Sequence, residues 1–309
     1  MAYKSRPTKP GAERSGVKPD VIITYMVPND TESGLLEYLY AMMPERKRTT
    51  VKDFLRHNQV MVNDTITHQW DMPLSGGETI RINTTREWQT FSNPRLSIVY
   101  EDDDIIVVNK GYGLLSMGTD TKREGTAYSI LRDWVKRNDP RSKLFIVHRL
   151  DQTTSGLMMF AKTLQAKEAM QYNWNNMVLE RRYVAVIEGA LEPAEGTIRS
   201  YLAENSAHEM YSVSDPSAGQ LAITDYKTLR VRGAFSLVEL QLATGRKNQI
   251  RVHMKEAGHP IVGDRRYGAQ SSPIRRVALH AMTLRFVHPT TRRDMNFSTP
   301  IPDSFRRLV

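Results

Sequence analysis

The chain has 309 residues, and its 43 Lys and Arg outnumber its 34 Asp and Glu, which gives a net charge of +9. A chain of this length forms roughly two domains, and a hydrophobic content of 40% supports a large core, which excludes general disorder. The absence of cysteine excludes disulfides, thiolate nucleophiles and cysteine-ligated metals. Because no signal-like or membrane-length apolar run occurs, we expect a cytoplasmic protein with no membrane partner.

Composition and hydrophobic pattern divide the chain into four segments. A start rich in Pro, Gly, Lys and Arg, without periodicity, predicts a disordered basic tail, and a second stretch without periodicity predicts a linker. The predicted segments are the tail at 1–20, a small α/β domain at 21–83, the linker at 84–94 and a larger domain at 95–309.

In the small domain, helical spacing of apolar residues runs from Ser33 to Met43, and Thr50 is a candidate N-cap of a second helix. Residues 60–64 alternate like a strand that ends in a turn. Gly76 and Gly77 predict a turn into a further strand.

The larger domain mixes hairpin-like and crossover spacings, which predicts an α+β fold with a mixed, largely antiparallel central sheet and flanking helices. Gly258 is the expected C′ residue of its third helix, and Pro260 follows as a stop. Strands are predicted at 96–100, 105–108, 157–161, 182–187, 224–231 and 236–242, and helices at 127–136, 164–177 and 247–257.

The positive charge is concentrated in one C-terminal stretch. Residues 246–293 hold eleven Lys and Arg against two acids, so the rest of the chain is balanced. Such a stretch indicates either a solvated charged face or a surface that neutralises backbone phosphates.

Several familiar ligand motifs are missing. The chain has no phosphate-binding G-x-x-x-x-G-K-[ST] segment, and the glycines at 111 and 113 lack the third glycine of a dinucleotide fingerprint. The eight histidines form no compact ligand pair. The three acids at 102–104 predict a solvated loop between two strands rather than a metal or glycosidase site. We therefore expect no metal and no cofactor.

The densest polar cluster is His-Arg-Leu-Asp-Gln-Thr-Thr-Ser-Gly at 148–156, between the apolar runs 144–147 and 157–160. A loop that joins two buried strands is a usual place for functional side chains. Taken alone, Asp151 next to three hydroxyl residues is also typical of a self-bonded turn.

This cluster resembles the signature of the RluA-type RNA pseudouridine synthases. Three further segments are similar to the motifs of that family and occur in the same order: Arg-Tyr-Val-Ala-Val-Ile-Glu-Gly at 182–189, Ala-Ile-Thr-Asp-Tyr at 222–226, and the run from Thr244 to Gly268 that contains Gly-Arg-Lys-Asn-Gln-Ile-Arg-Val-His. The resemblance covers essentially all of 95–309.

The resemblance implies the pseudouridine synthase fold, a cofactor-independent uridine isomerase and an RNA partner. It places the catalytic aspartate on Asp151, the active-site tyrosine on Tyr183 and the basic partner of the aspartate on Arg251. Arg149 matches an arginine that helps to displace the target base from its stack. Asn248 stands where the third motif usually has histidine, so the role of that side chain is open.

The implied chemistry suits these residue types. Breaking and remaking the bond between ribose and uracil requires an ionised carboxylate near the sugar, either as nucleophile or as base. An adjacent arginine lowers the pKa of a carboxylate by roughly 1–3 units, so we expect Arg251 to keep Asp151 charged. Tyr183 offers a flat face for the uracil. Removing the base from its stack costs a few kcal/mol, which a cation such as Arg149 could offset in part.

The basic residues around the third motif are the candidate RNA contacts. Lys247, Arg251 and Lys255 are spaced to share one helix face, with Arg251 expected to face Asp151 and its neighbours to face RNA. The predicted RNA-binding residues are Arg149, Arg246, Lys247, Lys255, Arg275 and Arg276.

The N-terminal domain resembles the small RNA-binding domain named after a ribosomal small-subunit protein. Arg48, Lys52 and Arg56 have helical spacing, and Val60–Asn63 matches its strand, although 21–90 carries a net charge of −2. This domain favours large-subunit ribosomal RNA as the substrate over transfer RNA. A non-catalytic RNA-binding or ribosome-assembly factor and a carbohydrate hydrolase are the alternatives. We expect a monomer.

Overall fold

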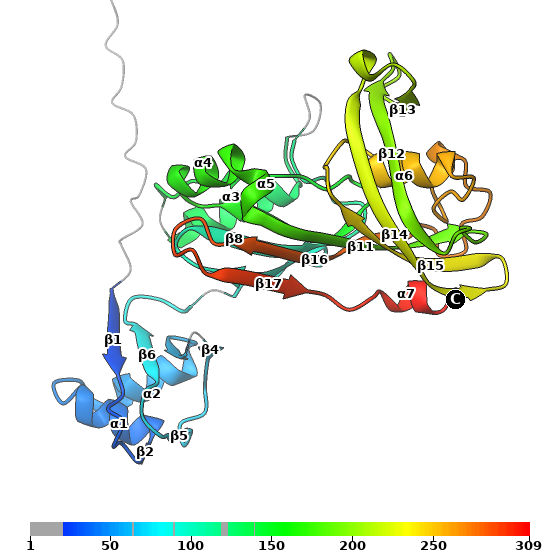
Figure 1. Cartoon of the computed structure of the whole chain (residues 1–309). Helices are drawn as coiled ribbons and strands as arrows, with labels where there is room; N and C mark the ends of the chain where they lie inside the picture. Colours follow the sequence, from blue (N-terminus) through cyan, green and yellow to red (C-terminus); the bar gives the residue numbers. More distant parts are fainter. Residues whose placement is uncertain (1–20, 64, 89, 119–122, 139) are drawn as a thin grey trace, which may run out of the picture. The chain divides into compact units, whose positions relative to one another are not determined.

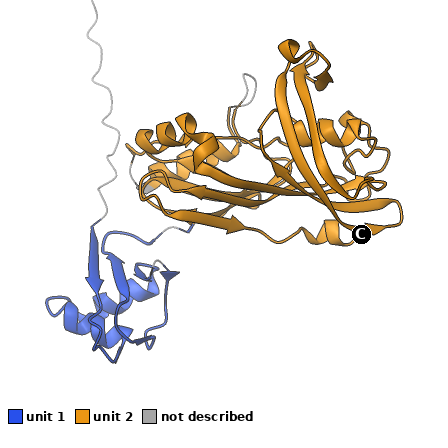
Figure 2. Ribbon diagram, in the orientation of Figure 1, with its two compact units in different colours: residues 1–90 blue, residues 91–309 orange. Residues whose placement is uncertain are grey.

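The computed structural model describes residues 21–309 apart from 64, 89, 119–122 and 139. The chain divides into two compact units, residues 1–90 and 91–309 (Figure 2). The predicted tail at 1–20 lies outside the described residues. Among the described helices, none combines the length and the apolar character that a membrane crossing requires.

The first unit packs two helices on a four-stranded sheet. Its core is formed by inward-facing side chains such as Val60, Val62, Ile80 and Ile82 together with the apolar faces of both helices. The strands run in the order β1-β6-β3-β4, and a separate pair, β2 and β5, lies apart from that sheet. The elements are β1 (Ile22–Met26), β2 (Ser33–Gly34), α1 (Leu35–Met42), α2 (Arg48–Arg56), β3 (Val60–Val62), β4 (Thr65–Ile66), β5 (Pro73–Leu74) and β6 (Thr79–Asn83).

Two predicted helix starts in this unit were wrong. Ser33 pairs with Leu74 in the short strand β2, so α1 begins only at Leu35. The second helix begins at Arg48 with Lys47 as its N-cap, which puts Thr50 inside the helix. The turn predicted at Gly76 and Gly77 is confirmed, and both have positive φ, where glycine avoids the steric penalty of a side chain.

The segment predicted as a linker, 84–94, is attached to the first unit over its first half. The N–H of Thr84 donates to the carbonyl of Val21, and the N–H of Trp88 donates to the carbonyl of Asn58. The boundary between the two units follows residue 90.

The second unit is built on an 11-stranded sheet with the main order β13-β12-β14-β15-β11-β16-β10-β8-β7, to which β17 and β9 add beside β16 and β10 (Figure 1). β10 pairs with β16 in parallel, and the other pairings described are antiparallel. The strands are β7 (Leu96–Glu101), β8 (Ile105–Lys110), β9 (Phe145–Ile146), β10 (Ser155–Ala161), β11 (Val178–Glu188), β12 (Glu195–Glu204), β13 (Met210–Val213), β14 (Gln220–Arg232), β15 (Phe235–Leu242), β16 (Leu279–Val287) and β17 (Asp294–Ser298).

This architecture confirms the predicted α+β class with a mixed, largely antiparallel sheet. The six predicted strands are all present, and each is as long as predicted or longer. The unpredicted strands include β12 and β17, whose exposed and half-buried residues alternate, so their sequences lack a strong apolar run.

Helices cover the sheet in three places: α3 on one face of β8 and β10, α4 and α5 on the other face, and α6 beside β13 and β14 (Figure 1). The helix predicted at 164–177 is interrupted at Asn173, which is the C-cap of α4. The helix predicted at 247–257 begins at Gln249, after Asn248 in the left-handed conformation, and Gly258 is confirmed at positive φ behind it. The helices are α3 (Ala127–Asn138), α4 (Leu164–Tyr172), α5 (Trp174–Met177), α6 (Gln249–Glu256) and α7 (Asp303–Arg306).

Strands β8 and β10 are buried on both faces, which explains their continuous apolar sequences. On one face Val108 and Phe160 pack with Leu131 of α3. On the other face Val107 and Met159 pack with side chains of α4, α5 and β16. This double burial makes the middle of the sheet a rigid base for the loop that leads into β10.

The loop 148–154 enters β10 where that strand meets β16. Ser155 pairs with His280 and Gly156 with Ala281. Gly156 has φ +116°, and a Cβ at this position would lie 2.2 Å from the carbonyl oxygen of Ala281. Only glycine allows the two backbones to approach this closely.

We predict that Gly156→Ala destabilises the fold, because the new methyl group collides with the backbone of β16. Gly233→Ala is the matched control, since Gly233 also has positive φ but a Cβ there would meet no atom of the described residues within 4 Å, apart from its chain neighbours. The control should show only the backbone strain, about 1–2 kcal/mol. Urea unfolding measures both variants, and equal losses of unfolding free energy would contradict the close approach as the reason for Gly156.

Candidate active site

The backbone on both sides of Asp151 is fastened to the turn at 111–116. The hydroxyl of Ser116 donates to the carbonyl of Leu150 at 2.5 Å and accepts from the N–H of Leu150 at 3.1 Å. After Asp151, the carbonyl of Gln152 accepts from the N–H of Gly113 at 2.9 Å. The position of the Asp151 backbone is therefore set by hydrogen bonds to its two neighbours.

His148, at the start of the same loop, holds the loop to the backbone of β10. Its Nε2 accepts the backbone N–H of Met159 at 3.0 Å. Burial, and secondarily Arg181, lowers the pKa of His148 to about 3. The ring is thus neutral and works as a fixed hydrogen-bond acceptor.

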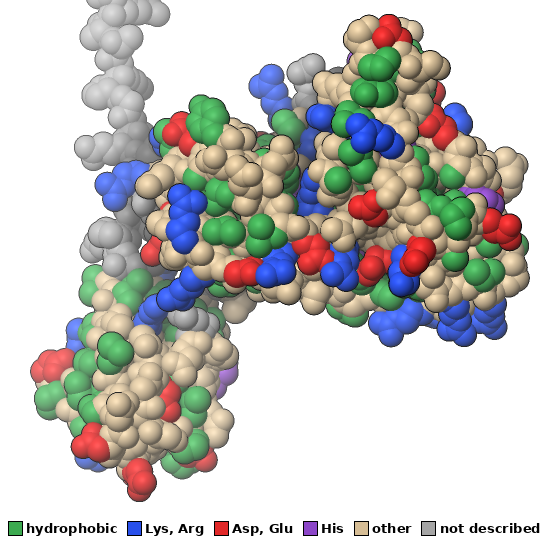
Figure 3. Space-filling view, viewed as in Figure 1, with side chains coloured by type: hydrophobic (Ala, Val, Ile, Leu, Met, Phe, Trp, Pro, Cys, Tyr) green, Lys and Arg blue, Asp and Glu red, His purple; other side chains and the backbone are tan. Residues whose placement is uncertain are grey.

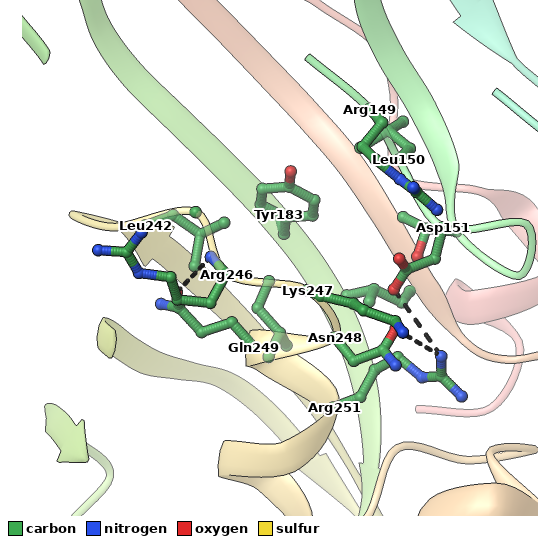
Figure 4. A pocket seen from close by; sticks show the side chains of 14 residues that line it. Arg149, Leu150, Asp151, Tyr183, Leu242, Arg246, Lys247, Asn248, Gln249 and Arg251 are labelled. Atoms are coloured by element: carbon green, nitrogen blue, oxygen red, sulfur yellow. Dashed lines mark hydrogen bonds and ion pairs between the residues drawn. The ribbon is translucent and has the colours of Figure 1, made fainter. Parts of the chain in front are cut away.

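The structure brings the three predicted catalytic residues into one pocket. Asp151, Tyr183 and Arg251 line a cavity of about 180 Å³ between the 148–154 loop, β11 and α6. Figure 4 shows the Asp151 carboxylate directed toward Arg251, with the Tyr183 ring beside the same space and Arg149 above it. Residues from distant parts of the sequence thus meet around a space suited to a single base.

Arg251 is held mainly by a carboxylate that was not among the predicted site residues. Its Nε and Nη2 donate to the two carboxylate oxygens of Asp264 at 2.6 and 2.8 Å. Its Nη1 lies 3.8 Å from Oδ2 of Asp151. Tyr267 packs against the guanidinium, with its ring centroid 4.6 Å from the Arg251 Cζ. The third motif contains both Asp264 and Tyr267, so it could have drawn attention to them. The motif alone does not show that Arg251 is their partner.

Asn248, the departure from the family pattern, acts as a positioning residue for the same guanidinium. Its Oδ1 accepts from Nη1 of Arg251 at 3.0 Å, and its Nδ2 donates to the hydroxyl of Tyr267 at 3.0 Å. Its left-handed backbone, at φ +54°, immediately precedes α6. The side chain is therefore used, although sequence alone left its role open.

Burial dominates the electrostatics of Asp151. Burial raises the pKa of the Asp151 carboxyl, and the positive charges of Arg251, Arg149 and Lys110 act in the opposite direction. Arg251 lowers the pKa of Asp151 as expected, but burial outweighs this effect, so the pKa of Asp151 is raised overall. A raised pKa makes the ionised carboxylate more basic and better suited to attack or proton removal.

Lys110 is a buried cation that the sequence analysis did not single out. Its Nζ donates to the carbonyls of Gly111 and Leu114 at 3.1 and 2.9 Å. Burial lowers the pKa of Lys110 to about 8, and the negative charge of Asp151 opposes that shift. Lys110 thus ties the 111–114 turn together and contributes positive potential at Asp151.

Tyr183 keeps its proton in this site. Burial raises the pKa of Tyr183 to about 12. The neutral ring therefore presents an apolar face and a hydroxyl to the pocket.

The predicted RNA contacts have different surroundings. Arg149 and Arg246 are exposed and line the pocket. Lys247 precedes α6 instead of sharing its face, and its Nζ binds Glu204 at 2.6 Å. Lys255 is exposed at the end of α6.

Arg275 and Arg276 also differ in their exposure to solvent. Arg275 is exposed, whereas Arg276 is half-buried and donates to the hydroxyl of Ser155 at 2.6 Å. The Arg276 guanidinium also lies 4.9 Å from the ring centroid of Tyr112. Other cations of the basic stretch form ion pairs with carboxylates: Lys247, Arg251, Arg266 and Arg285. The positive stretch is therefore partly internal to the fold.

The acids at 102–104 form a turn between β7 and β8, as predicted. The Asp102 carboxylate accepts from the hydroxyl of Tyr100 and from the N–H groups of Asp104 and Ile105, at 2.7 to 2.8 Å. It is also bonded to His288 at 2.9 Å. Its oxygens are thus engaged in structural contacts.

Comparisons with known proteins point to one family. The family model described as RNA pseudouridylate synthase matches residues 104–256. The ribosomal large subunit pseudouridine synthase D of Neisseria meningitidis is 34% identical over 92% of this chain and 80% of its own, and that of Haemophilus influenzae is 33% identical over 91% and 92%. An uncharacterised RNA pseudouridine synthase of Bacillus subtilis is 31% identical over 91% of this chain and 94% of its own.

Solved structures show the same fold. The human RNA pseudouridylate synthase domain containing 4 has a TM-score of 0.56 and 25% identity, over 68% of this chain and 90% of that one. The human RNA pseudouridylate synthase domain containing 1 has a TM-score of 0.55 and 29% identity, over 69% and 86%. The chain belongs to the RNA pseudouridine synthase family. It is an enzyme of the isomerase class, with the fold that the resemblance implied.

We predict that Arg251→Gln lowers the unfolding free energy by about 3–5 kcal/mol, because it leaves the carboxylate of Asp264 buried without its cation. Asp264 is 1% exposed. Arg285→Gln is the control, since Arg285 pairs with Asp294 at the surface, where an ion pair contributes little. Urea denaturation checks both variants. Equal stability of the two would show that the Arg251–Asp264 pair does not stabilise the fold.

Proposed function

We propose that this protein converts uridine to pseudouridine in large-subunit ribosomal RNA, with Asp151 as the catalytic group. The family membership supports the reaction, and the names of the bacterial relatives support the substrate. The observation that carries the assignment of the residue is the position of the Asp151 carboxylate in the pocket, 3.8 Å from the Arg251 guanidinium and opposite Tyr183.

The reaction breaks the bond from C1′ of ribose to N1 of uracil and forms a bond from C1′ to C5. It is an isomerisation, so no atom or electron pair is gained, and the proton on C5 is exchanged for one on N1. The Asp151 carboxylate serves as the nucleophile at C1′ or as the base that removes the 2′ proton. Both roles require the ionised form, which Arg251, Arg149 and Lys110 favour against the effect of burial.

Tyr183 and Arg149 have separate roles in this proposal. Tyr183 provides the surface against which the detached uracil turns, and burial keeps its hydroxyl protonated. Arg149 is exposed at the pocket, and Figure 4 shows its side chain close to Asp151. A cation there would offset part of the cost of unstacking, which is a few kcal/mol.

We predict that Asp151→Asn lowers the rate of tritium release from RNA labelled at C5 of uracil by at least about 10²-fold, because the amide cannot act as nucleophile or base. Release by the native chain is expected from ribosomal RNA and not from transfer RNA. The reverse preference would overturn the proposed substrate, and an Asp151→Asn variant with full activity would exclude Asp151 as the catalytic group.

The same substitution carries its own folding control. The pKa of Asp151 is raised in the folded state. Above that pKa, the ionised carboxylate therefore lowers the free energy of unfolding. This loss of stability disappears as the pH falls through the folded-state pKa and the group takes up a proton. Asp151→Asn should therefore be at least as stable as the native chain at pH 7. A loss of activity together with a loss of stability would point to misfolding instead.

We infer that the first unit binds RNA through one face of α2. Arg48, Lys52 and Arg56 follow each other at helical spacing. Trp70 is 63% exposed, and two hollows of about 410 and 490 Å³ share Lys52 and Trp70 in their linings. An aromatic ring beside cations is typical of surfaces that bind unpaired nucleotides. In the linings of the two hollows, the cations Arg48, Lys52 and Arg56 outnumber the acids Glu37 and Asp71.

We predict that Trp70→Ala weakens binding of ribosomal RNA roughly fivefold or more, because stacking on one base is lost. Met26→Ala is the control, since Met26 is a 75% exposed apolar side chain of β1 that lines neither hollow. Filter binding of the full chain measures both. Equal affinities of the two variants would remove Trp70 from the RNA-binding surface.

A further inference from the structure

A second hollow adjoins the catalytic pocket. It measures about 680 Å³, against about 180 Å³ for the pocket itself, and lies between β11, α5 and the 241–246 segment. Cavities of roughly 300–1,000 Å³ are typical of small-molecule sites, so this hollow has room for more than the target base. The two spaces share Arg149, Tyr183, Leu242, Gly245 and Arg246.

The basic side chains at this junction are visible from the surface. In Figure 3, Lys and Arg gather in the depression between the part of the unit that holds α4 and α5 and the part that holds β12 and β14. Arg149 and Arg246, which line both spaces, are exposed. A strand that places one nucleotide in the catalytic pocket therefore passes a positively charged rim before it reaches the second hollow.

Arg181 projects into the second hollow and not into the catalytic pocket. It precedes Tyr183 by two residues on β11, so the two side chains lie on the same face of the strand. Its Nη2 donates to the carbonyl of Leu242 at 3.3 Å, and its Cζ lies 5.8 Å from the ring centroid of Trp174. The carbonyl and the ring hold the guanidinium in place without neutralising it.

No carboxylate of the described residues forms an ion pair with Arg181. The one carboxylate in the lining, Glu180, is paired with Arg182. Arg181 is only partly exposed, and burial lowers its pKa. A guanidinium withdrawn from water without a counter-charge is unfavourable. An anion in the hollow would offset that cost.

Gly245 makes room for this guanidinium. A Cβ at Gly245 would lie 2.5 Å from Nη1 of Arg181, and Gly245 belongs to the rim that the two spaces share. The Arg181 side chain thus lies directly against the Gly245 backbone. Gly245 is at the rim that an RNA strand would cross on leaving the catalytic pocket.

We propose that Arg181 binds a backbone phosphate of the RNA strand next to the target uridine. The ligand is a phosphodiester, and a planar guanidinium suits its oxygens because two N–H groups can donate in parallel. Trp174 and the Leu242 carbonyl orient the guanidinium, and Gly245 gives the strand access to it. The substrate class rests on the proposed function, and the phosphate contact is an addition to it.

The test compares Arg181→Gln with the native full-length chain on large-subunit ribosomal RNA. Loss of a hydrogen-bonded charge contact should weaken binding about tenfold. The slope of log affinity against log salt should fall by about 0.7, the contribution of one phosphate on a single strand. Arg285→Gln is the charge-matched control, because Arg285 lies on β16 in a surface pair with Asp294 and lines neither space. It should bind like the native chain.

Phosphate-ethylation interference locates the contact. In the native complex, ethylation of a phosphate beside the modified uridine should prevent binding, and Arg181→Gln should be insensitive at that one position. Arg181→Lys, which keeps a charge, should restore sensitivity there. Gly245→Ala, which displaces the guanidinium, should lose it. These two variants decide the question if Arg181→Gln fails to fold in urea titrations.

An identical interference pattern in the native chain and Arg181→Gln would overturn the proposal, even if activity fell, because Arg181 would then act only within the fold. The proposed reaction and the proposed phosphate contact are tested by different measurements. A native chain that releases tritium but has no Arg181-dependent phosphate contradicts the phosphate site alone. A native chain with such a phosphate and no tritium release contradicts the reaction alone.

Discussion

The site depends on how one guanidinium is divided between two carboxylates. Asp264 takes the two short hydrogen bonds of Arg251, and Asn248 takes a third, so the side chain cannot swing toward Asp151. The Asp151 carboxylate lies 3.8 Å from Arg251, so it is stabilised by the positive charge but does not form a short hydrogen bond with the guanidinium. A carboxylate with its lone pairs committed to an arginine would be a poor nucleophile or base. The geometry thus places positive charge beside the Asp151 carboxylate without the short hydrogen bonds that Asp264 makes to Arg251, as the proposed role of Asp151 requires.

The surrounding fold fixes the position of the Asp151 loop and that of Arg251 separately. On one side, the turn at 111–116 holds the Asp151 loop at the edge of a strand pair buried on both faces. On the other side, Thr224 of β14 accepts from Nε2 of Gln249 at 2.9 Å and is bonded to His253 at 2.9 Å. These bonds place α6, and therefore Arg251, against the sheet. Thr224, which belongs to the family-like segment at 222–226, thus acts on the site through α6.

Sequence patterns predicted the fold class and the strands with apolar runs, because burial on both faces leaves a plain local signal. They placed α6 two residues too early, since Asn248 adopts a left-handed conformation that spacing does not show. The assignment of Asp151, Tyr183 and Arg251 came from motif resemblance, and their roles stay predictions. Asp264 and Lys110 were missed because their importance lies in which distant groups they meet. That Arg181 meets no carboxylate partner among the described residues likewise depends on three-dimensional neighbours, which the sequence does not show.

The parallel pairing of β10 with β16 has a consequence for how the site comes into being. The two strands touch at Ser155 and His280, whose side chains are joined at 2.8 Å, and His280 is in turn bonded to Thr299. During synthesis, Ser155 and Gly156 have no strand partner on this side until β16 has emerged, because β9 pairs only with Phe160 and Ala161 at the far end of β10. A contact of such sequence separation forms late. The Asp151 loop therefore reaches its final shape only after β16 has been synthesised.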